Sequence, residues 1–414
     1  MPETPQGREP RGSLTVFYLS TFLGVFAHAM FIYGLVVVVT DRAHSTTVTS
    51  LAYFMAFFTM AIMTPSRALL ADLQPKIPLL RRCQIGMAMA VLFVALLVWM
   101  AKEGTAVGVG AIILAGLYGY ASGGIAGTRM ALLPQIVRNV AGPTMVVQTM
   151  ITVAFSIGPL LYAELRVATG DSIAMTGVAL LLMASAFTLP RLAEVQNKDK
   201  APGQTVWVGT TETYEHFRDV DLLWQALLLG TIPALLVLGP IQAVLPKMMT
   251  LSFPGDERFR AGFFGLMGAG LFLGSTLSLA HVGRSAHRKM LVGLFVIIAG
   301  TTLAVMPFVP SKAIFSGLAL ICGIGLGVPG AVIPVLLQEG TNSQFRSRVM
   351  NTNTLRVTVM PAIGAVLCGA LSDGAGVKLS IALFGVASVV LTVAALAAIR
   401  RSERIFQSRA SSLP

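Results

Sequence analysis

The chain has 414 residues, of which 55% are apolar and 12% are charged. So few charges exclude an ordinary soluble protein and are typical of a chain that crosses a membrane several times. The formal charge of +12 could suit a nucleic-acid partner, but the basic residues gather in the gaps between apolar stretches. We therefore expect them to reflect membrane orientation, and we expect no nucleic-acid ligand.

About twelve apolar stretches, most of them near 20 residues long, follow one another along the chain. A bilayer core about 30 Å thick needs roughly 20 helical residues to cross it. The stretches do not alternate between apolar and polar residues as barrel strands do, so the pattern predicts helices. We expect spans near residues 14–39, 47–70, 84–101, 107–128, 143–165, 172–190, 221–247, 261–281, 289–308, 312–337, 350–372 and 378–399.

The longest polar interval inside the chain divides six spans from six. Lys and Arg are concentrated on the side of the predicted membrane where this interval lies, so the positive-inside rule places both chain ends in the cytoplasm. The expected organisation is a cytoplasmic tail (1–13), a six-helix half (14–192), a cytoplasmic central loop (193–220), a second six-helix half (221–399) and a cytoplasmic tail (400–414).

Corresponding gaps in the two halves repeat the same order of residue types. After span two, residues 71–73 (Ala-Asp-Leu) precede the basic pair at 81–82; after span eight, residues 280–282 (Ala-His-Val) precede the basic pair at 288–289. Spans four and ten are both rich in glycine. The expected fold class is an all-α membrane protein with twelve transmembrane helices in two pseudo-symmetric six-helix halves. Secondary transporters with this architecture bind substrate between the halves, near the midplane.

With these motifs the chain resembles the major facilitator superfamily over nearly its whole length. Within the superfamily it looks most like the drug and siderophore exporters grouped with the enterobactin exporter. The residues that carry the resemblance are Leu70-Ala71-Asp72 with Arg81-Arg82, Thr128-Arg129 to Leu132-Leu133-Pro134, Gly158-Pro159, and Arg346-Ser347-Arg348-Val349-Met350 leading to Gly364, Gly369, Ala370, Leu371, Ser372 and Asp373.

Four positions depart from the patterns of the family. Ala68 and Leu73 stand where the cytoplasmic signature of the superfamily usually has glycine and arginine. Tyr162, followed by Ala163, stands where the span-five motif of antiporters usually continues with a pair of glycines. The resemblance nevertheless implies the major facilitator fold and alternating access to a midplane site.

Ionisable side chains deep in a bilayer are functional candidates, because burying them there costs several kcal/mol. His28 lies close to the middle of span one, and imidazole exchanges protons near physiological pH, so His28 is a candidate for proton coupling. The alternative is a neutral histidine that hydrogen-bonds a neighbouring helix.

Arg356 lies inside span eleven, one turn beyond Asn353. A guanidinium presents a planar set of donors that suits a carboxylate or phosphate, so these two residues are candidates for contact with an anionic substrate group. Alternatively, Arg356 snorkels towards the cytoplasm. Four neutral polar residues within spans are further candidates for lining a substrate site: Tyr33, Tyr118, Gln148 and Gln242.

The resemblance also implies a gate at the cytoplasmic side, where the aspartate of the signature loop latches the two halves in one state of the cycle. The gating residues expected on this basis are Asp72, Arg81, Arg82, Arg129, Gly158 and Pro159. The alternative for Asp72 is an ordinary solvated loop charge.

We find no nucleotide-binding loop and no catalytic constellation in the sequence, so we expect no enzyme, no cofactor and no metal. The leading hypothesis is a monomeric, proton-coupled exporter of a small amphiphilic molecule, a siderophore or a drug, in the plasma (bacterial inner) membrane. An importer or a lipid transporter of the same fold is the alternative within transport. A transporter-like sensor without flux is the alternative from another class.

Overall fold

The computed structural model describes residues 11–43, 45–73, 75–101, 104–137, 141–190, 221–278, 287–341 and 346–411. The expected central loop lies outside these ranges. The elements in chain order are α1 (Arg11–Ala43), α2 (Thr46–Leu73), α3 (Lys76–Met100), α4 (Thr105–Ser122), α5 (Ile125–Ile136), α6 (Ala141–Thr169), α7 (Asp171–Phe187), α9 (Asp221–Pro233), a π-helical turn (Ala234–Leu238), α10 (Gly239–Ala243), α11 (Leu245–Ser252), α12 (Glu257–Leu277), α13 (Arg288–Val305), a 3₁₀ turn (Met306–Phe308), α14 (Lys312–Glu339), α15 (Arg346–Ala375) and α16 (Val377–Ser411).

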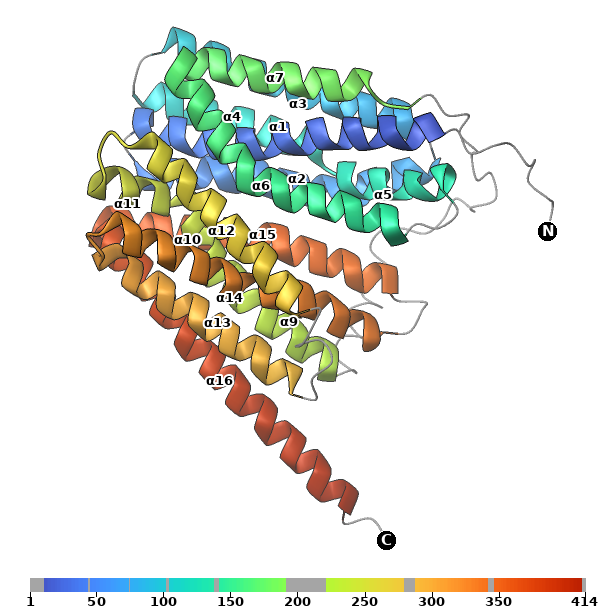
Figure 1. Cartoon of the computed structure of the whole chain (residues 1–414), viewed down its shortest axis with the longest axis vertical. Helices are drawn as coiled ribbons and strands as arrows, with labels where there is room; N and C mark the ends of the chain where they lie inside the picture. Colours follow the sequence, from blue (N-terminus) through green and yellow to red (C-terminus); the bar gives the residue numbers. More distant parts are fainter. Residues whose placement is uncertain are drawn as a thin grey trace, which may run out of the picture.

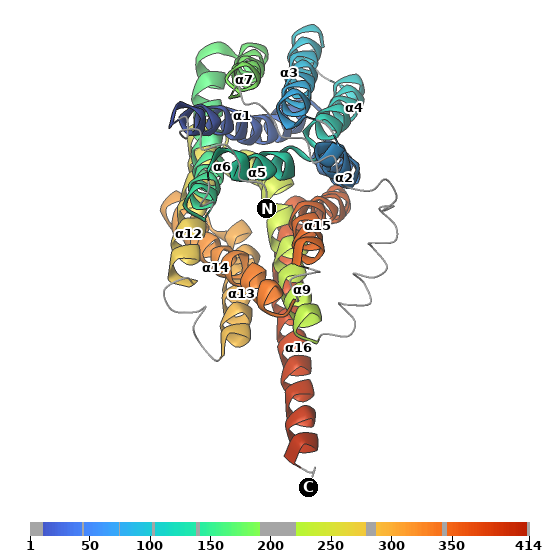
Figure 2. The same ribbon diagram turned by 90° about the vertical axis from the view of Figure 1, so that its right-hand side faces the viewer.

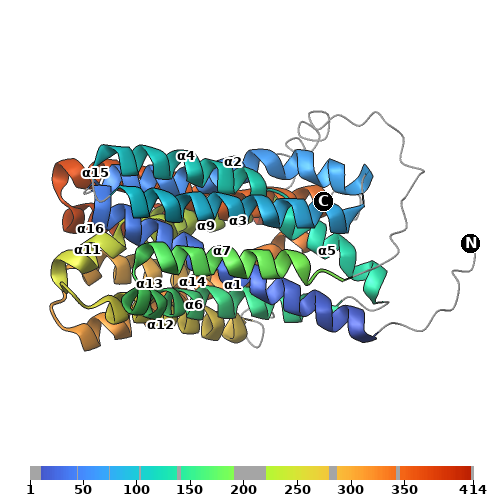
Figure 3. The same ribbon diagram turned by 90° about the horizontal axis from the view of Figure 1, so that it is seen from above.

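The helices form two groups that lie side by side. Figure 1 shows α1 to α7, coloured blue to green, on one side and α9 to α16, yellow to red, on the other. Seen from above, the helices run roughly along one common direction (Figure 3). The groups meet along two seams, where α2 packs against α15 and α6 packs against α12. We call them the N-terminal group and the C-terminal group.

The outer surface of the bundle is apolar. Trp99 is 73% exposed, and Phe187 and Leu180 are also exposed. Hydrocarbon tolerates such side chains, whereas an exposed backbone would lack hydrogen-bond partners there, which favours helices. Within the described ranges, nine helices are long and apolar enough to cross a bilayer, and α4 and α7 contain shorter apolar stretches.

Several helices differ in extent from the sequence expectation. Helix α3 begins at Lys76 rather than near residue 84, and α15 begins at Arg346 rather than near residue 350. The segment expected as a C-terminal tail continues α16 to Ser411, which projects beyond its group (Figure 2). Apolar length therefore predicted where the helices lie along the chain, but polar end turns lengthen the helices beyond the apolar stretches.

The fourth expected span is interrupted. Helix α4 ends at Ser122, and α5 starts after Gly124, whose φ of 78° lies in the left-handed region that favours glycine. The seventh expected span is also irregular, because a π-helical turn follows Pro233 and proline is the second residue of both α10 and α11.

The glycine-rich helices pack closely against a neighbour in each group. In the N-terminal group, a Cβ at Gly119 of α4 would overlap the carbonyl oxygen of Ala56 in α2. In the C-terminal group, a Cβ at Gly323 of α14 would overlap the carbonyl oxygen of Met267 in α12. Small residues at such positions let backbones approach and are typical of helix pairs in membranes. The two groups thus use the same packing device at corresponding helix pairs.

The close contact between α12 and α14 predicts that the stability cost of a glycine-to-alanine substitution in α14 depends strongly on its position. We expect Gly323→Ala to destabilise the protein by about 1 to 3 kcal/mol, because the added methyl group forces two backbones apart. Gly317→Ala is the matched control, since nothing lies within 4 Å of a Cβ there. The measurement is the thermal unfolding midpoint in detergent; equal midpoints for both variants would contradict the close approach.

Candidate functional site

His28 lies in an aromatic setting formed by three other helices of the N-terminal group. Its Nδ1 is 2.7 Å from the hydroxyl oxygen of Tyr118 in α4, and the two rings stack with centroids 5.7 Å apart. Phe57 of α2 and Phe155 of α6 present T-shaped contacts at 6.4 and 5.9 Å. The structure therefore brings together two residues that the sequence marked separately, His28 and Tyr118.

Tyr33 lies on the seam between the two groups. Its ring is 5.3 Å from that of Phe264 in α12 and 6.1 Å from that of Tyr162 in α6. Tyr162 is buried, and its ring fills the space beside Gly34, where a Cβ would be 2.5 Å from Tyr162 Cζ. A glycine on α1 thus accommodates the large side chain that replaces a glycine of the span-five motif.

Arg356 is buried in the C-terminal group, with 8% of its surface exposed. Its Nε and Nη2 donate to Oδ1 of Asn353, at 3.2 and 2.8 Å. The guanidinium lies against Gly230 of α9, where a Cβ would be 2.6 Å from Cζ of Arg356. Asn353 and Arg356, both predicted from the sequence, therefore interact directly, and the neutral amide of Asn353 orients the charged guanidinium.

Arg129 differs from the sequence expectation of a cytoplasmic loop charge. Its side chain is only 7% exposed and lies inside the N-terminal group, against Gly24 of α1 and close to Ser185 of α7. No described residue accepts a hydrogen bond from its Nε. Because α5 continues the interrupted span into the bundle, Arg129 points between helices and not into a loop.

Gly158 and Pro159 lie in the middle of α6, which touches both groups. Gly158 packs against Ala29 of α1. Pro159 is inside the helix and cannot donate the backbone hydrogen bond of that turn. On the adjoining stretch, Ser156 packs against Gly268 of α12. A weakened point of α6 therefore lies at the junction of α1, α6 and α12.

The remaining predicted residues are dispersed. Gln242 is half-buried on α10, and Arg81 donates from Nε to the carbonyl oxygen of Ala186 at 3.3 Å, which ties α3 to the end of α7. Arg82 is exposed. The side chains of Asp72 and Gln148 lie outside the described part of the structure.

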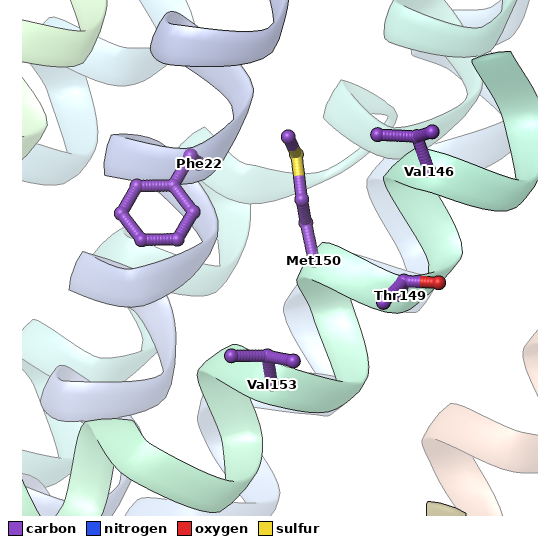
Figure 4. A pocket seen from close by; sticks show the side chains of 5 residues that line it. All are labelled: Phe22, Val146, Thr149, Met150 and Val153. Atoms are coloured by element: carbon purple, nitrogen blue, oxygen red, sulfur yellow. The ribbon is translucent and has the colours of Figure 1, made fainter.

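A small apolar hollow of about 350 Å³ lies between α1 and α6. Figure 4 shows Phe22 of α1 facing four side chains of α6 across it, Val146, Thr149, Met150 and Val153. None of the residues predicted from the sequence lines this hollow, so we do not assign the candidate site to it.

One end of the bundle, at the left of Figure 1, links the two groups through charged side chains. Helices α1, α6 and α15 end there, and α2, α7 and α12 begin there. We call it the linked end. Arg166 of α6 lies at the centre. It contacts Asp41 of α1 at 2.8 Å, Asp171 of α7, and Glu257 of α12 at 3.3 Å. The last of these ion pairs joins the N-terminal to the C-terminal group.

Arg260 of α12 completes this network. It lies 3.4 Å from Glu257 and 3.8 Å from Asp41 of the other group. Further out, Arg258 of α12 pairs with Glu164 of α6 at 2.8 Å. Acidic and basic side chains from both groups thus alternate around Arg166, so each charge faces an opposite one.

Asp373, near the end of α15, caps the N-terminus of α2 across the other seam. Its carboxylate accepts hydrogen bonds from the backbone N–H groups of Thr46 and Thr47, both at 3.1 Å, and from the hydroxyls of Thr47 and Ser45, at 2.6 and 3.1 Å. Lys247 of α11 donates to the hydroxyl of Thr46 at 2.6 Å. A helix N-terminus carries free N–H groups and a partial positive charge, so a carboxylate suits it.

Asp256 provides a comparison at the same end, because it caps a helix of its own group. Its side chain accepts from the backbone N–H of Phe259 in α12 at 3.0 Å and pairs with Lys312 of α14. The hydrogen bond from Lys312, with that from Phe259, holds the pKa of Asp256 below its ordinary value. It therefore stays ionised at neutral pH without linking the groups.

Sequence reasoning missed the linked end. Asp41 and Glu164 stand near the ends of predicted spans, but the sequence does not show which basic side chains they face. Complementary charges at helix ends on the same predicted side of the membrane were the available signal. The partners that link the two groups are 91 to 328 residues apart in the sequence, as for Arg166 with Glu257 and Ser45 with Asp373.

The cap across the seam predicts that Asp373→Ala opens the linked end more often. A lost cap costs about 1 kcal/mol, which corresponds to about a fivefold change in population. The measurement is the labelling rate, with a membrane-impermeant maleimide, of a Ser50→Cys probe on the buried face of α2 in a background without the native cysteines. Asp256→Ala is the control, since it removes a cap within one group; equal labelling in both variants would refute the linking role of Asp373.

No protein-family model and no curated protein matches the sequence. Solved structures do match. A variant of the nucleoside transporter NupG superposes with a TM-score of 0.77 at 12% identity, covering 93% of this chain and 99% of that chain. A bacterial homologue of the human lysosomal transporter Spinster, inward-facing and unoccupied, gives 0.74 at 14%, covering 94% and 96%.

A transporter of the POT family in complex with 5-aminolevulinic acid gives a TM-score of 0.74 at 11% identity, covering 94% of this chain and 96% of that chain. These structures come from differently named transporters, all at 14% identity or less, so the likeness selects no subgroup. The three superpositions extend over nearly the full length of each chain. The chain therefore has the fold of the major facilitator superfamily.

Proposed function

We propose that this protein is a secondary transporter that works by alternating access. In this proposal all twelve helical passes cross the bilayer, and the halves 14–192 and 221–399 rock about a site between them, joined by the loop 193–220. The observation that carries the proposal is the linked end. Its contacts between groups are ion pairs and a helix cap, which water can replace when the groups separate.

The proposed cargo is a small amphiphilic molecule, a siderophore or a drug, exported from the cytoplasm by a monomer in the plasma (bacterial inner) membrane. With both chain ends cytoplasmic, the linked end faces outwards, and its contacts close the protein to the outside. The gating residues proposed for the opposite end and for α6 remain Asp72, Arg81, Arg82, Gly158 and Pro159. Tyr33, Gln148 and Gln242 remain proposed as substrate contacts.

His28 is the proposed coupling residue, and its bond to Tyr118 supplies a mechanism. A neutral imidazole can accept a hydrogen bond from the phenol at Nδ1, whereas an imidazolium can only donate there. When the neutral ring carries its proton on Nε2, protonation at Nδ1 turns the Tyr118 hydroxyl from donor to acceptor. Since the bond joins α1 to α4, the proton changes a contact inside the N-terminal group.

We expect His28→Ala to lose proton-driven transport. In everted vesicles, efflux substrates such as siderophores and dyes are tested with and without an uncoupler; uncoupler-sensitive transport should fall to the rate of vesicles without the protein. Tyr118→Phe leaves the imidazole of His28 in place, so this variant should retain coupling. Its pH profile should shift, because the hydrogen bond from the phenol is lost. Wild-type rates for His28→Ala between about pH 6 and 8 would rule out this role.

Two alternatives make different predictions. An importer or lipid transporter of the same fold would show uptake or lipid exchange where efflux is absent. A sensor would bind a ligand without any flux. Asp72→Asn separates a working gate from a sensor, because loss of flux at unchanged membrane levels supports the gate.

A further inference from the structure

Among the described residues, the interior of the bundle holds positive charge without matching acids. Arg129 and Arg356 are both buried, and in the part of the chain that the structure describes no carboxylate forms an ion pair with either. The acids that do pair lie near helix ends: Asp41, Glu164, Asp171, Asp256, Glu257, Glu339 and Asp373. A buried charge without a counter-charge is costly, so a negative partner would be strongly favoured.

Arg356 has a geometry that leaves its charge available. Both of its described hydrogen bonds go to one neutral atom, Oδ1 of Asn353, and no described residue accepts from Nη1. An aspartate at position 353 would have neutralised the guanidinium internally. The asparagine instead fixes the orientation of the guanidinium and leaves its net charge at +1.

Arg356, on α15, lies among residues of two further helices, α9 and α14. Gly230 of α9 lets the guanidinium lie directly against the helix, and a Cβ at that position would also be 2.8 Å from Cδ1 of Ile333 in α14. Arg356 is ten residues into α15, which is about 15 Å along the axis. A snorkelling arginine would bring its head to water, but this one is 92% buried, as the exposure of 8% shows.

We infer that Arg356, oriented by Asn353 against Gly230, binds an oxyanion of the transported molecule, a carboxylate or a phosphate carried on an apolar body. The inference rests on the proposed transport function and deepens it by naming the class of cargo. Two N–H groups of a guanidinium match the two oxygens of a carboxylate. The buried aliphatic side chain of Ile333 beside it suits the apolar part of the ligand.

The test uses three probes of one shape and different charge: 1-naphthoate, 1-naphthalenemethanol and 1-naphthylmethylammonium. Binding to the full chain in neutral phosphatidylcholine nanodiscs is measured by equilibrium dialysis at neutral pH. The wild type should bind naphthoate at least about tenfold more tightly than the alcohol, as charge-assisted hydrogen bonds allow. The ammonium probe should bind most weakly.

The variants separate a binding role from a structural one. Arg356→Gln should bind naphthoate and the alcohol equally. Asn353→Asp should also lose the preference for the anion, while its unfolding midpoint stays the same or rises because a new internal ion pair forms. Arg400→Gln is the control, since Arg400 is exposed on α16 and contacts Met290. It should keep the wild-type preference.

The outcomes also separate this inference from the proposed function. Equal binding of the three probes by the wild type, or no binding of naphthoate at millimolar concentration, overturns the oxyanion site. An unchanged preference in Asn353→Asp overturns it as well. If one of these results is found and the protein still shows uncoupler-sensitive transport of a cationic dye, the proposed transport function holds and only the oxyanion site is refuted. If the protein prefers naphthoate but shows no flux of any substrate, the oxyanion site is supported and the proposed transport function is refuted.

Discussion

The N-terminus of α2 depends on a carboxylate that belongs to the other group of helices. The first N–H groups of any helix lack partners within it, and most helices satisfy them with a nearby side chain. Here Ser45 caps Val48 locally at 3.3 Å, while Thr46 and Thr47 bond to Asp373 of α15. The groups can separate only if water takes over these bonds. The helix end itself therefore provides the contact that holds the seam closed.

The sequence predicted the helices because hydrocarbon imposes their length and forbids unpaired backbone groups. It also marked the glycines that let α4 and α14 approach their neighbours. It could not predict which substitutions compensate for each other. Tyr162 looked like a departure from the span-five motif, but Gly34 on α1 supplies the missing space. Such an exchange between helices becomes visible only when both are packed.

The candidate site was predicted in parts. His28 and Tyr118, and Asn353 with Arg356, were named from their depth, and the structure pairs them. Arg129 was expected at the cytoplasmic end of span four, because the sequence shows no break in that span. In the structure the chain turns at Gly124, and Arg129 lies inside the bundle. A carboxylate that links the two groups, the role expected of Asp72, is present at Asp373, which caps a helix of the other group. The two aspartates stand at equivalent places, near the ends of helices that run antiparallel along one seam.

Charge is distributed differently at the linked end and in the interior, and this difference bears on function. Around Arg166, three acidic side chains face it from α1, α7 and α12, and Arg42 and Arg260 balance them, so opening the linked end leaves these charges balanced within each group. The exposed pair of Arg258 with Glu164 is the exception, and water solvates both of its charges. Deep in the bundle, Arg129 and Arg356 have only neutral neighbours among the described residues. A protein gains nothing in stability from an unpaired buried guanidinium. Its retention is understandable if the opposite charge arrives with the cargo and leaves with it.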